Sequence, residues 1–301
     1  MIETIQPTDE KHWLLLRKQD VTSTEVAALF GISPYCTAYE LWHRKHDNLE
    51  VEFEPNERMK WGTRLQDSIA KGICEDQGWD HVRRMTEYIR DTELRAGASF
   101  DFGDESSILE IKNVDSLAFR DGWVVEGDNV EAPPHIELQV QQQLMLSGYK
   151  RATIGALIGG NRVVLIKREP DPVIVTSIKK RIKEFWESIH ADKPPTPDFQ
   201  RDSDFIGHLY SYAEPGSVFN ADTRVSRLAA LYKDASQEEK AAKLKKEAAK
   251  AEILTIIGNA EKVVGPWGSI SAGLIGPCHM EYERPGYRNF KVNFKKEKSN
   301  A

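Results

Sequence analysis

Apolar and polar residues repeat along this chain with two different periods. Segments with apolar residues at steps of three and four, or with helix end signals, predict helices; they cover residues 25–30, 38–44, 57–77, 134–148 and 173–190. Segments that alternate every second residue, or form short apolar runs, predict strands; they cover residues 82–91, 94–102, 108–114, 152–158 and 163–167. Helices therefore flank a central group of strands in an α/β (α+β) domain, and the strands at residues 82–91, 94–102 and 108–114 are expected to form a meander.

Local signals place several element boundaries. Ser23 or Thr24 is expected to cap the helix at residues 25–30, because a hydroxyl there accepts a free backbone N–H. Gly78 is the expected stop of the longest helix of this region. The Gly-Gly-Asn sequence at residues 159–161 predicts a hairpin, because these residues tolerate positive φ.

A Pro- and Asp-rich segment, residues 191–204, predicts a linker. The expected domains are residues 1–204 and an appendage of residues 205–301. In the appendage, residues 223–257 predict one long helix or a helical hairpin, and residues 265–295 a small strand pair. Mixed charges on the long helix favour a solvated surface; the alternative is docking to a neighbouring subunit or a partner through an apolar seam.

Composition narrows the class of protein. The 301 residues include 41 Lys and Arg against 47 Asp and Glu, a net charge of −6. This excludes a uniformly basic DNA-packing protein, but not an enzyme with a locally basic cleft. No apolar run is long enough to span a membrane, and the first residues lack a secretory signal. The three cysteines form no CxxC pair, which favours a reducing cytosol over a zinc knuckle or a disulfide framework.

The candidate chemistry lies mid-chain. Glu110 and Lys112 are two apart on a predicted strand, so both side chains point to one face. Leu109 and Ile111 point to the opposite face, into the core. Asp101 ends the preceding strand, and two carboxylates beside a backbone carbonyl suit Mg²⁺, which would activate water for attack on a phosphate. The alternative is an ordinary solvent-facing ion pair on an edge strand.

Four glutamines crowd into five residues of the predicted helix at residues 134–148: Gln139, Gln141, Gln142 and Gln143. They indicate either a solvated helix face or a set of amides that holds a phosphate or a water at the site.

Several stretches resemble, in order, the phage lambda-exonuclease and YqaJ-type viral recombinase nucleases of the PD-(D/E)xK superfamily. They are Leu16-Arg17, residues 22–35 (TSTEVAALFGISPY), 39–42 (YELW), 61–63 (WGT), 101–112, and 138–141 (LQVQ) with Leu144 and Gly148. The resemblance spans roughly residues 12–190. It implies a restriction-endonuclease-like core, with a central mixed sheet flanked by helices.

The resemblance also implies an activity and partners. The activity is Mg²⁺-dependent 5′-to-3′ degradation of linear double-stranded DNA, with Mn²⁺ able to substitute, leaving 3′ overhangs for a single-strand annealing protein. A homo-oligomer, a ring of three that threads DNA, and the cytoplasm of a bacterial host carrying the phage or prophage are expected, with no membrane partner.

Site roles follow from the resemblance. Asp101 and Glu110 would bind the metal with the carbonyl of Ile111, Lys112 would orient the attacking water, and Gln139 would position the site.

Arg17, Ser23 and Ser99 match the pocket for the terminal 5′-phosphate. An arginine fork with hydroxyls is what a phosphate pocket needs. The alternatives are helix capping by Ser23 and a plain surface charge at Arg17.

The chain departs from the family pattern at three places. Phe100 replaces the Pro before the first Asp, and Phe102 replaces the Gly that follows it. Four residues after Gly62, where the family often has a metal-binding Glu, stands Gln66, which can ligate through its amide oxygen but brings no charge. Asp67 is an alternative ligand only if the helix is rotated.

Two other functions stay open. One is a structure-specific or single-strand DNA endonuclease on the same core. The other is a non-catalytic DNA-end-binding scaffold, with the appendage as its working part.

Overall fold

The structure, a computed structural model, describes residues 1–47, 49, 56–127, 129–279, 281–282, 287–290 and 292. The chain divides into two compact units, residues 1–206 and 207–301, and each is described by itself. The division falls two residues after the boundary expected at residue 204. No described helix is long and apolar enough to cross a bilayer.

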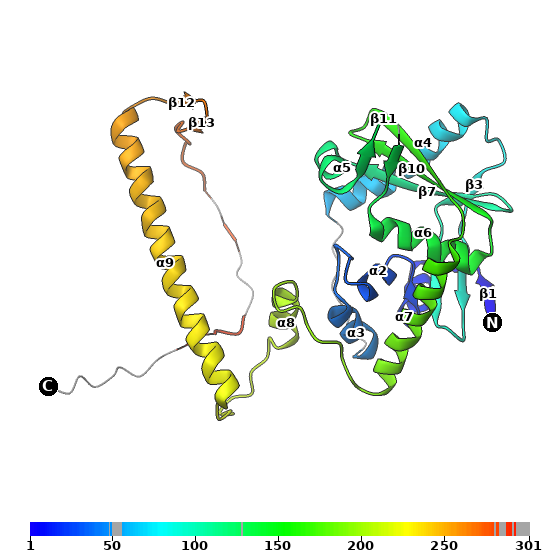
Figure 1. Cartoon of the computed structure of the whole chain (residues 1–301), viewed down its shortest axis with the longest axis horizontal. Coiled ribbons are helices and arrows are strands. Elements are labelled where there is room, and N and C mark those ends of the chain that lie inside the picture. Colours follow the sequence, from blue (N-terminus) through cyan, green and yellow to red (C-terminus); the bar gives the residue numbers. More distant parts are fainter. Residues whose placement is uncertain are drawn as a thin grey trace. The chain divides into compact units, whose positions relative to one another are not determined.

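The first unit contains both helices and strands (Figure 1). The helices are α1 (Glu10–Gln19), α2 (Val26–Leu29), α3 (Ala38–His46), α4 (Glu57–Gln77), α5 (Ser116–Gly122), α6 (Pro134–Ser147) and α7 (Pro172–His190). The strands are β1 (Ile2–Ile5), β2 (Val21–Thr22), β3 (Arg83–Arg84), β4 (Tyr88–Asp91), β5 (Ala96–Ser99), β6 (Phe102–Gly103), β7 (Ser107–Val114), β8 (Val124–Glu126), β9 (Asn129–Glu131), β10 (Arg151–Ile158) and β11 (Arg162–Arg168). Strands β3 to β7 follow one another without a helix between them. Helix α8 (Ser203–Leu209) spans the division between the units.

The strands form two main sheets rather than one meander. The five-stranded sheet has the order β11-β10-β7-β6-β3, in which only β10 and β7 are parallel, so the sheet is mixed. The four-stranded sheet has the order β1-β4-β5-β2. The chain passes from one sheet to the other between β5 and β6, at Phe100 and Asp101. The expected meander is therefore wrong, and the crossing point carries a candidate carboxylate.

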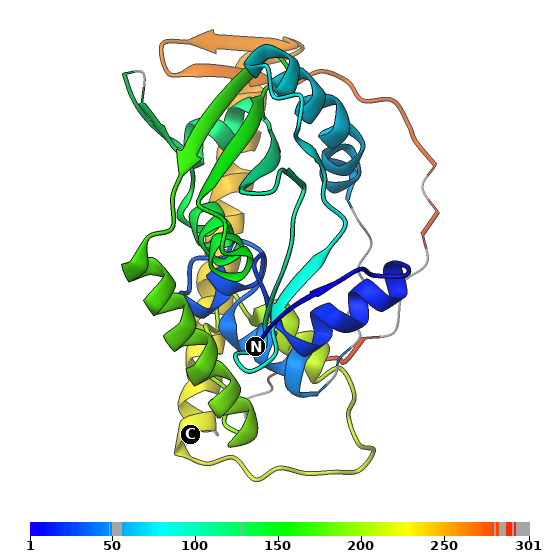
Figure 2. The ribbon, with the colours of Figure 1, turned by 90° about the vertical axis from the view of Figure 1, so that its right-hand side faces the viewer.

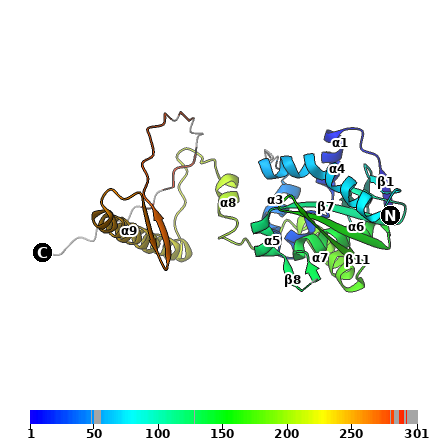
Figure 3. The same ribbon diagram turned by 90° about the horizontal axis from the view of Figure 1, so that it is seen from above.

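Helices cover both faces of the five-stranded sheet, as predicted, with α4 and α7 on opposite sides in Figure 3. Ile69 and Ile73 of α4 pack against Leu109 on one face. The other face joins a larger core with α6 and α7, which includes Ile108 and Ile154. Figure 2 shows the hairpin β10–β11 beside these helices, in green. The predicted mixed sheet flanked by helices is confirmed.

Elements defined by local signals occur where expected. Helix α4 ends at Gln77, and Gly78 follows with φ +67°. The β10–β11 hairpin turns through Gly159 and Gly160, both at positive φ. The predicted cap of α2 is wrong, because that helix begins after Glu25 with no side-chain cap.

The expected linker at residues 191–204 is also wrong, because its end packs on the first unit. Asp202 is 1% exposed, and its Oδ1 accepts from Thr37 Oγ1 at 2.5 Å. Its Oδ2 accepts from the backbone N–H of Asp198 at 2.8 Å. Arg201 donates to the carbonyl of Gly31 at 3.1 Å. The segment is thus fastened to the loop between α2 and α3.

The second unit contains a single long helix, α9 (Thr223–Ile257), rather than a helical hairpin. It has no buried residue, and the seam of Ala241, Leu244, Ala248 and Ala251 is exposed. Strands β12 (Lys262–Gly265) and β13 (Gly268–Ser271) form an antiparallel pair that begins before the expected range. Past Ser271, the described residues add no further strand.

Replacing Asp202 should destabilise the first unit. Asp202→Ala removes the acceptor of a buried hydroxyl and a backbone N–H, and should lower the free energy of unfolding by about 2 kcal/mol. The exposed Asp204 is the matched control, and Asp204→Ala should change it by less than about 0.5 kcal/mol. Urea unfolding followed by tryptophan fluorescence measures both, and equal losses would contradict the role of Asp202.

Candidate active site

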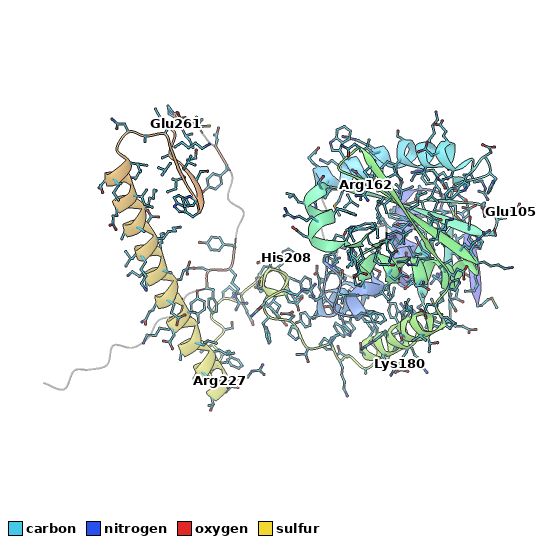
Figure 4. The ribbon with its side chains drawn as sticks, turned by 45° about the horizontal axis from the view of Figure 1, so that its top comes forward. Glu105, Arg162, Lys180, His208, Arg227 and Glu261 are labelled. Atoms are coloured by element: carbon cyan, nitrogen blue, oxygen red, sulfur yellow. The ribbon has the colours of Figure 1, made fainter. Side chains whose placement is uncertain are left out.

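Strand β7 places its side chains on two faces. Leu109 and Ile111 point into the core, as predicted, and pack there against α4. Glu110, only 3% exposed, lies on the opposite face, under α6. By contrast, Glu105, in the turn before β7, lies on the outside of the unit (Figure 4). Because Glu110 is buried on a central strand, the interpretation as a solvent-facing pair on an edge strand is wrong.

Three donors hold the Glu110 carboxylate. Its Oε1 accepts from Lys112 Nζ at 2.7 Å and from Gln139 Nε2 at 2.6 Å, and its Oε2 accepts from Gln143 Nε2 at 2.8 Å. Lys112 Nζ also donates to Gln139 Oε1 at 3.0 Å. The ammonium and the two amides therefore fix both oxygens of one buried carboxylate.

Asp101 lies at the open edge of the same strand. The pairing of β6 with β7 ends at Leu109, and beyond it the backbone N–H of Ile111 donates to Asp101 Oδ2 at 2.8 Å. The N–H and the carbonyl of a strand residue point to the same edge, so the Ile111 carbonyl faces this side too. The structure thus brings the two carboxylates, the carbonyl and the ammonium to one place.

Gln66 reaches this place from α4. It lies near enough to Asp101 to act against the rise of that carboxyl's pKa, and its Oε1 accepts from Arg84 Nη2 at 3.0 Å. Asp67 is 71% exposed and faces Arg84 Nη1 at 3.2 Å. Gln66, rather than Asp67, is therefore the α4 residue beside Asp101.

The charged groups of the site shift the pKa values of Asp101 and Lys112. Burial and the neighbouring Glu110 raise the pKa of Asp101 to about 7, although Lys112 acts against this. Burial alone would lower the pKa of Lys112, but Glu110 and Asp101 together raise it, so the ammonium stays charged. A buried carboxylate whose ionisation is disfavoured by burial and by a second carboxylate is the setting that a divalent cation relieves.

The donor set fits Mg²⁺ or Mn²⁺ in kind. Asp101, Glu110 and the Ile111 carbonyl supply the oxygens that hard cations prefer. Among the described residues, no three His, Cys, Asp or Glu side chains come together as a metal site.

A second cluster surrounds Arg17. The Arg17 guanidinium lies over the Trp13 ring at 4.6 Å, and its Nη2 donates to Thr24 Oγ1 at 3.2 Å. Trp13 Nε1 donates to Ser99 Oγ at 2.8 Å. Ser23 is buried, and its backbone N–H donates to Gly97, two residues before Ser99. Arg17 and Ser99 are thus joined through Trp13, and Ser23 is bonded to β5, the strand that carries Ser99.

Trp13 is not among the site residues that the sequence predicts. Trp13 precedes Arg17 by four residues, and residues four apart on a helix lie side by side. This spacing is the sequence signal that links Trp13 to Arg17.

All four glutamines of α6 are buried, so the solvated-face interpretation is wrong. Gln142 Nε2 donates to the carbonyls of Val21 and Gly97, which joins β2 to β5. Gln143 Nε2 donates to the Ser99 carbonyl at 2.9 Å as well as to Glu110. Gln143 therefore links the Arg17 cluster to the carboxylate site.

Residues 12–150 match the family of YqaJ-like viral recombinase domains. The first unit contains a YqaJ-like domain. The chain is also 28% identical over 179 residues to the protein YqaJ of Bacillus subtilis strain 168, an alignment that covers 58% of this chain and 54% of that protein. The match thus spans about half the length of that relative.

Two solved structures are more distantly similar. The alkaline exonuclease LHK-Exo of Laribacter hongkongensis is 18% identical, with a TM-score of 0.48 over 66% of this chain and 99% of that one. A phage-related exonuclease of Haemophilus somnus 129PT is 13% identical, with a TM-score of 0.42 over 57% and 96%. Likenesses this low carry no information on activity.

The YqaJ-like domain, as matched, includes every residue of both clusters, from Trp13 to Gln143. Strand β10, the parallel partner of β7, starts one residue beyond the matched range. The hairpin β10–β11 and α7 therefore complete the packing around a site that lies within the matched residues.

The pKa of Asp101 predicts how cation binding depends on pH. A cation binds the ionised carboxylate, so Mn²⁺ affinity should fall about tenfold per pH unit below about pH 7. The folding stability of the cation-free protein should show the opposite pH dependence. In the folded chain Asp101 keeps a proton that it releases near pH 3.8 in the unfolded chain. The protein's unfolding free energy should therefore decrease as pH rises from about 4 to about 7.

Calorimetric Mn²⁺ titration and urea unfolding across this range measure the two effects. Asp101→Asn is the control, since it cannot ionise and should remove both dependences. If Asp101→Asn retains the pH profile of the parent, the profile arises from another group.

Proposed function

We propose that this chain is a Mg²⁺-dependent deoxyribonuclease that degrades linear double-stranded DNA from a 5′ end and leaves 3′ overhangs for single-strand-annealing recombination. The observation that carries the proposal is the convergence of Asp101, Glu110, the Ile111 carbonyl and Lys112 at one edge of β7. The YqaJ-like domain match and the Arg17 cluster beside that edge support it.

Each residue has a role in the proposed reaction. Asp101, Glu110 and the Ile111 carbonyl would hold Mg²⁺, which supplies Lewis acidity and a more acidic water when bound. Lys112 Nζ, held by Glu110 and Gln139, would orient that water toward the phosphorus. Gln139 fixes the ammonium on one side, and so sets the direction in which its remaining proton can point.

The phosphate pocket would choose the DNA end. Arg17 presents a guanidinium whose plane is fixed by Trp13, and the Ser99 hydroxyl is fixed by the same indole. A fork of this kind binds a phosphate dianion well. Because Gln143 joins Ser99 to Glu110, a terminal phosphate bound here would lie at a set distance from the carboxylates.

Lys112→Ala should abolish cleavage but leave Mn²⁺ binding within about threefold of the parent, because Lys112 is not a ligand. Glu110→Ala and Asp101→Ala should lose both properties. The measurement is digestion of end-labelled linear duplex with and without Mg²⁺, with a closed circular duplex as the control substrate.

Each outcome of this assay separates the functions. Cutting of the circle would favour the endonuclease alternative. A parent protein that binds ends without cutting them would favour the scaffold, and a Lys112→Ala protein that cuts at the parent rate would overturn the assignment of Lys112.

Arg17→Ala should slow digestion of 5′-phosphorylated ends by about ten- to a hundredfold, from the loss of a charge-assisted bond. Ends with a 5′-hydroxyl should be poor substrates for the parent and indifferent to the change. Lys18→Ala, at the next and outward-facing position of α1, is the matched control. Equal parent rates on both kinds of end would remove the phosphate pocket from the proposal.

The second unit is the proposed docking element. We infer a homo-oligomer, a ring of three as in the resembling family, and an annealing partner in the bacterial cytoplasm. The exposed residues Leu244, Ala248 and Ala251 of α9 would supply the contact.

A chain ending at Leu209 tests this role, because it keeps Asp202 and the whole first unit. It should fold and cut DNA, but lose the annealing partner or elute at a smaller oligomeric size. Retention of both assembly and partner would leave α9 as a solvated helix, and an insoluble product would place the second unit in the core.

A further inference from the structure

We propose that Arg84 binds a non-bridging phosphate oxygen of the DNA beside the metal-binding carboxylates. Its guanidinium supplies the positive charge on the side of the site where Gln66 brings no charge. This inference rests on the proposed nuclease function. It assigns to the site a positioning residue that neither the motif spacing nor the family pattern indicates.

Arg84 is fastened to the site through two neighbours. Strand β3 pairs with β6 so that Arg84 lies opposite Phe102, and the guanidinium sits 5.4 Å from the centroid of that ring. Its Nη2 donates to Gln66 Oε1, and Gln66 lies near enough to Asp101 to lower the pKa of that carboxyl. Only Gln66 therefore stands between the guanidinium and a proposed metal ligand.

The same guanidinium remains available to a ligand. The Arg84 side chain is 42% exposed, and its only ionic contact among the described residues is with Asp67, which is 71% exposed. Exposed pairs of this kind contribute at most about 1 kcal/mol. A phosphate that offers two oxygens to the arginine fork would displace such a partner.

Charge balance explains why a cation belongs here. Gln66 is neutral, so this side of the site has no third carboxylate that could bind a further cation. In a chain with a net charge of −6, DNA needs local positive groups near the scissile bond. Lys112 contacts Glu110 directly, and Arg84 contacts Gln66, the α4 residue beside Asp101.

The test uses the full chain and a 5′-phosphorylated duplex labelled at the far 3′ end. Fluorescence anisotropy in EDTA, across a series of NaCl concentrations, gives affinity without cleavage. Arg84→Met should weaken binding about tenfold and reduce the slope of log affinity against log salt by about one, as expected for one lost phosphate contact. Arg84→Lys, which keeps the charge, should retain the slope.

Arg83→Met is the matched control. Arg83 is the neighbouring residue on β3, points to the opposite face and pairs with Glu87, so its loss should leave the slope unchanged. Mn²⁺ binding by Arg84→Met without DNA, followed by electron paramagnetic resonance, should stay within threefold of the parent. An unchanged slope, an equal effect of Arg83→Met, or a parallel loss of Mn²⁺ binding would each overturn the proposal.

Cleavage separates this inference from the proposed function. If the parent cuts linear duplex with Mg²⁺ and Arg84→Met cuts equally well, only the role of Arg84 fails. If the parent cuts no DNA, the nuclease function fails, whatever the salt slope of Arg84→Met shows.

Discussion

The Glu110 carboxylate, buried on the central strand of the mixed sheet, is the group on which the site depends. A buried carboxylate without partners costs several kcal/mol, so the fold must bring donors to it. Lys112 comes from the same strand, whereas Gln139 and Gln143 come from α6. If α6 rotated or slid on the sheet, the buried Glu110 carboxylate would lose its two amide donors. The buried glutamines therefore hold the helix in register as well as shaping the site.

That constraint couples two sheets. Gln143 joins Glu110 of the five-stranded sheet to the Ser99 carbonyl of the four-stranded sheet, through one amide nitrogen. Asp101 stands where the chain crosses between the sheets and caps the open edge of β7. A displacement of either sheet would change the spacing between the Arg17 cluster and the carboxylates. The distance between the proposed end-binding pocket and the proposed metal site is thus a property of the packed core.

The sequence predicted those features that neighbouring residues determine. Helix α4 with its stop at Gly78, and the hairpin through Gly159, follow from local periodicity and turn chemistry. The alternation of β7 was enough to place Glu110 and Lys112 on one face.

Features that depend on distant partners escaped prediction. Residues 165 positions apart, Thr37 and Asp202, turn an apparent linker into a packed segment. Helix periodicity does not identify the partners of Gln139, Gln142 and Gln143, because their acceptors lie on β2, β5 and β7. The division into two sheets depends on which strands pair, and alternation alone does not encode this.

The site is electrostatically asymmetric, and the asymmetry follows from one residue. A carboxylate at position 66 would sit beside Asp101, whose pKa is already raised by burial and by Glu110, and would need a further cation to be tolerated. Gln66 avoids that repulsion and uses its oxygen to hold Arg84 instead. The positive charge on this side thus belongs to a side chain that is part of the fold. Such a side chain supplies positive charge without a bound cation, but it cannot polarise water as a metal does. In the proposed reaction, Arg84 therefore positions the phosphate, while activation of water stays with Asp101, Glu110 and Lys112.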